Sequence, residues 1–147
     1  MTTRAQSALR LRKLIFILLL FAIFAAIGFA VYQNSRWNVP EEAKRRQNPI
    51  APSPDALAAA RRIYLDKCVQ CHGETGKGDG SDAKMYFPAP ASFADAARMS
   101  TVTDGELFYE ISQGRKPMPA FKKRLTEEQR WQLVLLVRSF ANEASKR

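Results

Sequence analysis

The chain has 147 residues and a mass of 16.6 kDa, with 46% hydrophobic and 25% charged residues. This length and composition fit one folded domain with attachments, and they exclude two folded enzymatic domains. The formal net charge is +9, and the first 50 positions hold eight basic but only two acidic residues. Because the positive surplus lies at the amino end beside an apolar run, it favours membrane topology and argues against nucleic-acid binding.

Residues 14–32 form an apolar run without charge or proline. At 1.5 Å per residue such a helix is about 28 Å long, close to the thickness of a hydrocarbon core. Four basic residues precede the run: Arg4, Arg10, Arg12 and Lys13. Only Arg36 follows it closely, so the positive-inside rule places residues 1–13 in the cytoplasm and the remainder outside. We predict a single-pass signal-anchor helix over residues 14–32 in a bacterial inner membrane, with Trp37 at the outer interface.

A cleaved signal peptide is the alternative for this segment. Ala26-Ile27-Gly28 and Gly28-Phe29-Ala30 both resemble small-x-small cleavage sites. The apolar run is nevertheless longer than that of a usual signal peptide, which favours the uncleaved anchor.

Residues 33–53 have the composition of a periplasmic linker. They contain Pro40, Pro49 and Pro52, a basic patch at residues 44–46 and little that could enter a core. Fully extended, about 20 such residues reach roughly 65 Å. We therefore expect a long tether to the folded part.

Residues 54–147 are expected to form an all-α domain, because no convincing alternating strand occurs there. Three helices have start signals: Ser53 before Pro54, Thr103 with Glu106, and Thr126 with Gln129. Residues 73–102 are rich in Gly, Pro and Asp and are aperiodic. So long an irregular segment in a small domain indicates that it wraps a ligand.

The two cysteines of the chain, Cys68 and Cys71, are followed at once by its single histidine, His72. This CxxCH spacing is the covalent haem attachment signature. It lets two thiols reach the two vinyl groups of one porphyrin edge while the imidazole turns onto the iron. A zinc site lacks further ligands, a thioredoxin-like pair lacks its βαβ setting, and a disulfide across so small a ring contributes little stability.

The sixth iron ligand must come from farther along the chain, and Met85, Met99 and Met118 are the candidates. Met118 lies between two prolines, which restrict the backbone and hold the thioether on a stiff strap. That low entropic cost favours Met118, whereas Met85 and Met99 are better explained as loop or haem-edge packing.

The domain resembles the small single-haem c-type cytochromes, in particular cytochrome c6 and subunit III of cbb3 oxidase. The resemblance covers residue 53 to about residue 141 and rests on four stretches: CVQCHGETGKGDG, FPAPASF, ELFYEISQGRKPMPAF and LTEEQRWQLVLLVRSF. It implies a small cytochrome c fold of three or more helices around one covalent haem c, with the terminal helices crossed. It also implies His72 and Met118 as iron ligands, and the carbonyl of Pro88 or Pro90 as acceptor for the His72 ring.

Ligation by His72 and Met118 leaves no open site for a small-molecule substrate. We therefore expect a membrane-anchored electron carrier, not an enzyme, with unidentified redox proteins as donor and acceptor. A fixed haem subunit of a membrane oxidoreductase uses the same residues, and a haem sensor or peroxidase would need Met118 displaced from the iron.

Five cations lie within ten residues around the strap: Arg115, Lys116, Lys122, Lys123 and Arg124. Such a run is often merely a solvated surface. At an exposed haem edge it would steer docking onto an acidic partner.

Overall fold

The computed structural model describes residues 2–35 and 38–144. The chain divides into two units, Met1–Asn38 and Val39–Arg147. Met1, Arg36 and residues 145–147 lie outside the described residues, as does Trp37, which is expected at the outer interface.

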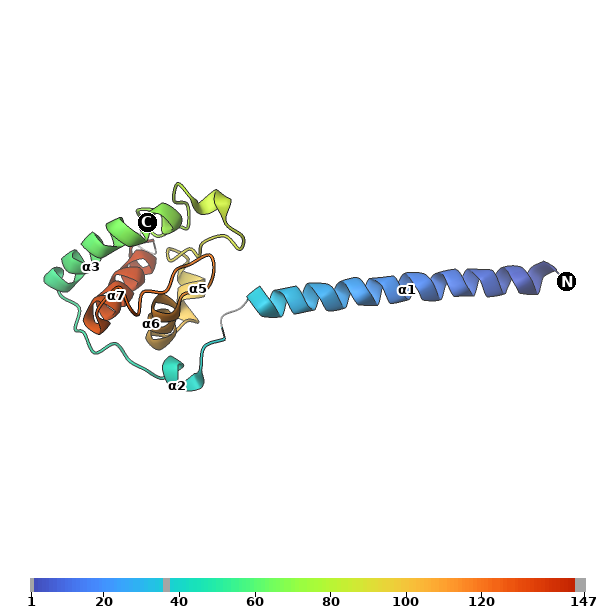
Figure 1. Ribbon diagram of the computed structural model, residues 1–147, viewed down its shortest axis with the longest axis horizontal. Helices are drawn as coiled ribbons and strands as arrows, with labels where there is room; N and C mark the ends of the chain where they lie inside the picture. Colours follow the sequence, from blue (N-terminus) through green and yellow to red (C-terminus); the bar gives the residue numbers. More distant parts are fainter. Residues whose placement is uncertain (1, 36–37, 145–147) are drawn as a thin grey trace. The chain divides into compact units, whose positions relative to one another are not determined.

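The first unit is a single helix, α1 (Thr2–Ser35), drawn in blue in Figure 1. Its apolar stretch Arg10–Ala30 is long and apolar enough to cross a membrane, and none of it is buried. This length and composition are compatible with a membrane-anchoring helix. The predicted apolar helix is therefore present, and it extends beyond residues 14–32 at both ends.

The second unit is built from helices and loops, and its described residues form no strand beyond one isolated bridge, Arg115 to Met118. The all-α prediction is confirmed. The elements are α2 (Glu41–Lys44), α3 (Pro54–Lys67), α4 (Val69–His72), the 3-10 turn η1 (Ala83–Met85), α5 (Ala96–Ser100), α6 (Asp104–Gln113) and α7 (Glu127–Ala144).

The predicted caps are present at the helix starts. Ser53 Oγ accepts from the Ala56 N–H at the start of α3. Thr103 and Glu106 form a reciprocal capping box at α6, which ends at Gln113 with Gly114 as its C-cap. A second reciprocal pair, Thr126 with Gln129, opens α7 and consists of two bonds of 2.9 and 3.1 Å. Each cap satisfies backbone donors that the first turn leaves unpaired.

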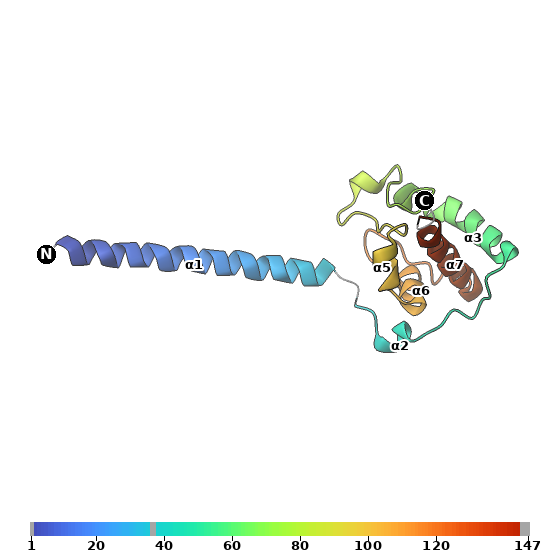
Figure 2. The same ribbon diagram turned by 180° about the vertical axis from the view of Figure 1, so that it is seen from behind.

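The core lies where α3 packs against α7, as both views show (Figures 1 and 2). Tyr64 of α3 and Phe140 of α7 meet with ring centroids 5.2 Å apart. Trp131, also on α7, stacks on Phe108 of α6 at 4.0 Å. These aromatic contacts join the three long helices of the unit into one apolar core. The expected pairing of the first and last helices of the domain is present.

Residues 39–53 differ from the expected linker. Val39 and Ala43 are buried, α2 packs against α6, and Ile50 lies against the core. The prediction that this stretch holds little that could enter a core is therefore wrong from Val39 onward. The reason is that polar residues of this stretch contact the domain: Arg46 lies over two aromatic rings, and Asn48 donates to a backbone carbonyl.

Candidate haem-binding site

Cys68 lies at the junction of two helices and brings both thiols and the histidine into one turn. Its N–H donates to the Tyr64 carbonyl at the end of α3, and its own carbonyl accepts from His72 N–H at 2.9 Å within α4. The φ angle of Cys68, −124°, interrupts the helix between these bonds. The short helix α4 therefore presents Cys71 and His72 directly after Cys68, as the attachment signature requires.

Cys68 and Cys71 do not form a disulfide with each other. Burial raises the pKa of Cys68 to about 12 and also raises the pKa of Cys71, to which Asp82 contributes. A dithiol redox pair depends on a lowered thiol pKa, so this environment does not favour that alternative. The zinc alternative also lacks support, because the described residues contain no group of three or more His, Cys, Asp or Glu able to hold a metal.

The His72 ring is fixed on two sides. Its Nδ1 lies 3.1 Å from the Ala91 carbonyl oxygen, and its face stacks on Phe93 with centroids 4.5 Å apart. A carbonyl only accepts, so Nδ1 carries the proton and Nε2 keeps the lone pair that can bind iron. Burial lowers the pKa of His72, which favours the neutral imidazole that a metal requires.

The acceptor is therefore Ala91, and the expectation of Pro88 or Pro90 is wrong. The Pro90 carbonyl instead faces Gly78, whose missing side chain leaves room for it. The next carbonyl along the loop then reaches the imidazole. Ala91 and Phe93 were missed because they lie in the aperiodic segment, where the sequence carries no signal of which carbonyl points toward His72.

Glycines after His72 bring the loop back to the helices. Gly76 has a φ of +71°, and a side chain there would overlap the Phe140 ring. Its carbonyl accepts from Phe93 N–H at 2.6 Å, which ties the start of the loop to the residue under the imidazole. Tyr64 adds a buried bond of 2.7 Å from its hydroxyl to the Gly73 carbonyl. Tyr64 thus has both a packing role and a role in positioning this loop.

The three candidate methionines have different environments. Met85 is 68% exposed and lies on η1, which packs against α4, the helix that carries His72. Met99 is 2% exposed within the core, and its carbonyl accepts from Arg138 at 2.6 Å. Met118 is partly buried and packs against the core from the loop after α6. Of the three, it alone combines contact with the core and a position outside any helix.

The loop carrying Met118, residues 114–121, is fastened to α6 and is called the strap below. Phe121 N–H donates to the Ile111 carbonyl at 3.1 Å, and Met118 N–H donates to the Arg115 carbonyl at 2.8 Å. Among the predicted docking cations on and after the strap, Lys116, Lys122, Lys123 and Arg124 are exposed and Arg115 is half-buried.

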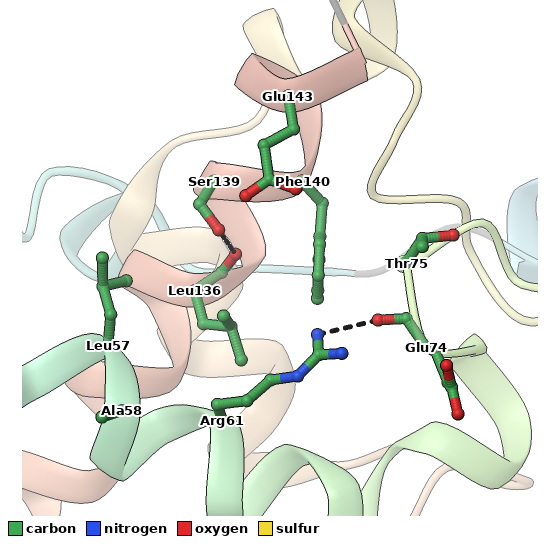
Figure 3. Close-up of a pocket in the computed structure, with 9 residues that line it drawn as sticks. All are labelled: Leu57, Ala58, Arg61, Glu74, Thr75, Leu136, Ser139, Phe140 and Glu143. Atoms are coloured by element: carbon green, nitrogen blue, oxygen red, sulfur yellow. Dashed lines mark hydrogen bonds between the residues drawn. The ribbon is translucent and has the colours of Figure 1, made fainter. Parts of the chain in front are cut away.

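The groove in Figure 3 is separate from these residues. It has a volume of about 430 Å³ and lies between α3, α7 and residues 74–75. Arg61 reaches across it and donates to the Glu74 carbonyl at 2.8 Å. Its lining includes neither Cys68, Cys71, His72 nor Met118.

The residues present fit haem c. Two thiols for thioether links, an imidazole with Nε2 available and a thioether on a short strap are the groups that a covalent haem with histidine and methionine ligands requires. Fold and site together define a c-type cytochrome domain, which implies haem c and electron transfer. Residues 55–137 match the family described as Cytochrome C oxidase, cbb3-type, subunit III, and the chain belongs to this family.

The chain is also similar to solved structures. A chain of the Kuenenia stuttgartiensis reducing HAO-like protein complex Kustc0457/Kustc0458 is similar with 27% identity and a TM-score of 0.54. The similarity covers 73% of this chain and 52% of that one. The KustC0563 c-type cytochrome is 33% identical over 55% of this chain and 95% of its own, with a TM-score of 0.49. No curated protein sequence matches the chain.

Proposed function

We propose that this protein is a membrane-anchored cytochrome with one haem c, which carries single electrons between redox proteins. Cys68 and Cys71 form the thioether links, and His72 and Met118 bind the iron. The observation that carries the proposal is the His72 ring, whose Nδ1–H is bonded to the Ala91 carbonyl at 3.1 Å, next to Cys71 and four residues after Cys68.

The chain's own residues prepare the site for this role. The Ala91 carbonyl and the Phe93 ring set the orientation of His72, so Nε2 is presented without a search among rotamers. Haem supplies the one-electron chemistry when bound. With His72 and Met118 both bound to the iron, the methionine sulfur would raise the reduction potential relative to two imidazoles, and no coordination position would remain open. This donor set supports electron transfer without substrate turnover.

The proposed anchor and its orientation are supported by α1 and by the basic residues before the apolar run. We place α1 as a single pass through a bacterial inner membrane, with the domain in the periplasm, where c-type haem is attached. The cluster of Arg115, Lys116, Lys122, Lys123 and Arg124 is proposed to steer an acidic partner toward the strap.

A fixed haem subunit of a membrane oxidoreductase is the second candidate. It is favoured by the similarity to a chain of a reducing HAO-like protein complex. Extraction in mild detergent distinguishes the two: a stoichiometric membrane partner that co-purifies would support the fixed subunit, whereas a lone haem protein supports the carrier. A sensor or peroxidase would instead require carbon monoxide to bind the reduced protein at neutral pH.

Haem staining after denaturing electrophoresis tests the attachment. Protein made in a host with the c-type maturation machinery should retain haem at the mass of the chain, and a Cys68→Ala/Cys71→Ala variant should not. Wild-type protein without stain would contradict the proposed function.

A further inference from the structure

Residues 39–50, called the clasp below, are built into the domain. Val39 is 6% exposed and Ala43 9% exposed, and Ile50 packs against the core cluster. Buried residues are unusual in a segment of mainly polar composition. They indicate that the clasp is docked on the domain. The clasp contacts α6 and α7, which are the helices that complete the domain.

The backbone of α2 lies directly on α6. Gly105, in the first turn of α6, has no side chain where the carbonyls of Ala43 and Arg46 approach it. A Cβ at this position would overlap the Ala43 carbonyl and lie 2.8 Å from that of Arg46. Glycine therefore permits this contact, whereas a side chain at this position would push α2 away from α6.

Two polar side chains fasten the second half of the clasp. The Arg46 guanidinium lies 4.6 Å from the Phe108 ring centroid and 5.2 Å from that of Trp131, and it pairs with Glu127 at 2.6 Å. Asn48 donates from Nδ2 to the Trp131 carbonyl at 3.0 Å. An arginine on aromatic faces gains more than an exposed ion pair alone, so these contacts together hold the segment in place.

The docked clasp leaves a very short connection to α1. Helix α1 ends at Ser35 and the clasp begins at Val39, so three residues separate them. A fully extended chain of this length reaches about 14 Å, against the roughly 65 Å expected of a free linker. Covalent length alone thus limits how far the domain can move from the end of the anchor.

We propose that the clasp keeps the haem domain at the membrane surface, and that its electron partner is a redox group held in or on the same membrane. The inference rests on the proposed anchor and haem, and it adds the class of partner. A domain of this size has a radius of gyration of about 13 Å, so a short tether keeps all of it in a thin layer at the surface. Confinement in this layer raises the effective concentration of the haem domain near a membrane-bound partner. It gives no such increase near a protein in solution.

Limited trypsin digestion of the membrane-bound holoprotein tests the docking of the clasp. The readout is cleavage after Lys44, identified by the amino-terminal sequence of the product. Gly105→Ala displaces α2, and Arg46→Ala/Asn48→Ala removes the fastening. Each should accelerate this cleavage about tenfold, since cleavage follows the population of the opened state. Arg45→Ala is the matched control, because it removes the neighbouring charge and one trypsin site from an exposed side chain.

The control should be cleaved within about twofold of wild type. Equal rapid cleavage of all four proteins would show an undocked linker and overturn the proposal. An unchanged haem spectrum in the variants verifies that the domain remains folded. Loss of haem from wild type would instead contradict the proposed function, so the two failures are distinguishable.

A spacer tests the class of partner. Twenty Gly and Ser residues inserted between Asn38 and Val39 leave every clasp contact in place but lengthen the tether. Haem reoxidation in native membrane vesicles should slow by about threefold, because the domain then samples a thicker layer. An unchanged rate, or a wild-type rate that depends on adding the soluble fraction, would contradict a partner in the membrane.

Discussion

The two sides of the proposed haem site are built differently. On the attachment side, His72 lies in the short helix α4, which follows α3 along the chain. Its ring is hydrogen-bonded to the Ala91 carbonyl and stacks on Phe93. On the other side, Met118 lies on a strap that is fastened by backbone bonds to α6 and is only partly buried. The first residue is held by its side chain, whereas the second is held by its backbone.

Because of this difference, we expect the attachment side to determine whether the haem site assembles and the strap to determine the chemical properties of the iron. Changes on the attachment side should prevent haem binding or destabilise the domain, because buried side-chain contacts are lost. Changes on the strap should leave the fold intact and alter the iron. Variants of the two sides therefore give effects that differ in kind as well as in size.

Replacing the histidine should have the largest effect. His72→Ala removes the iron ligand and the ring that packs on Phe93, so we expect little haem-bearing protein to accumulate. Haem staining and the yield of the reduced spectrum measure this. Accumulation of His72→Ala at wild-type levels with an unchanged spectrum would show that His72 is not a ligand.

Phe93→Ala should destabilise the domain by about 3 kcal/mol, because it leaves a cavity beneath the imidazole. Denaturant unfolding of the haem-bearing protein measures the loss. Replacing the exposed Phe87 by Ala is the matched control, since this ring is 92% exposed and should matter by less than about 0.5 kcal/mol. Equal losses in the two variants would contradict the packing described for Phe93.

Glu110 of α6 should make stability depend on pH. Burial raises the pKa of Glu110 to about 7, although Arg98 and Arg115 oppose this. The folded state thus favours the protonated form of Glu110. The stability that this protonation gives the folded state is complete below about pH 4.5 and is lost as the pH rises through 7. Glu110→Gln should remove a loss of about 1–2 kcal/mol between pH 5 and 8. Parallel stability profiles for the two proteins would count against this.

Reversing two exposed charges after the strap should have the smallest effect. Lys122→Glu/Lys123→Glu should slow electron transfer to an acidic partner severalfold at low salt and leave the fold unchanged. The difference from wild type should shrink as ionic strength rises, because exposed charges are screened. A wild-type rate that is flat from low to physiological salt would argue against electrostatic steering.

The parts that the sequence could predict are those fixed by neighbouring residues. Helix starts at Ser53, Thr103 and Thr126 are local, since each cap binds within its own first turn. The grouping of Cys68, Cys71 and His72 is equally local, because five consecutive residues determine it.

The parts that could not be predicted depend on contacts between distant residues. The acceptor for His72 is set by the path of an irregular loop, and that path depends on Gly78 facing the Pro90 carbonyl. In the sequence, Arg46 belongs to a basic patch that is typical of an exposed surface. In the structure, its guanidinium lies over aromatic rings of α6 and α7. Composition cannot indicate such docking, because it depends on the assembled surface that receives it.

The sulfur ligand to the iron tests the central claim most directly. Oxidised haem-bearing protein should show the weak long-wavelength absorption band of methionine sulfur bound to ferric haem. Met118→Ala should lose this band while keeping its covalent haem, and Met85→Ala and Met99→Leu should retain it. A band that survives in Met118→Ala, or is missing from the wild type, would contradict ligation by His72 and Met118 and with it the electron-carrier account.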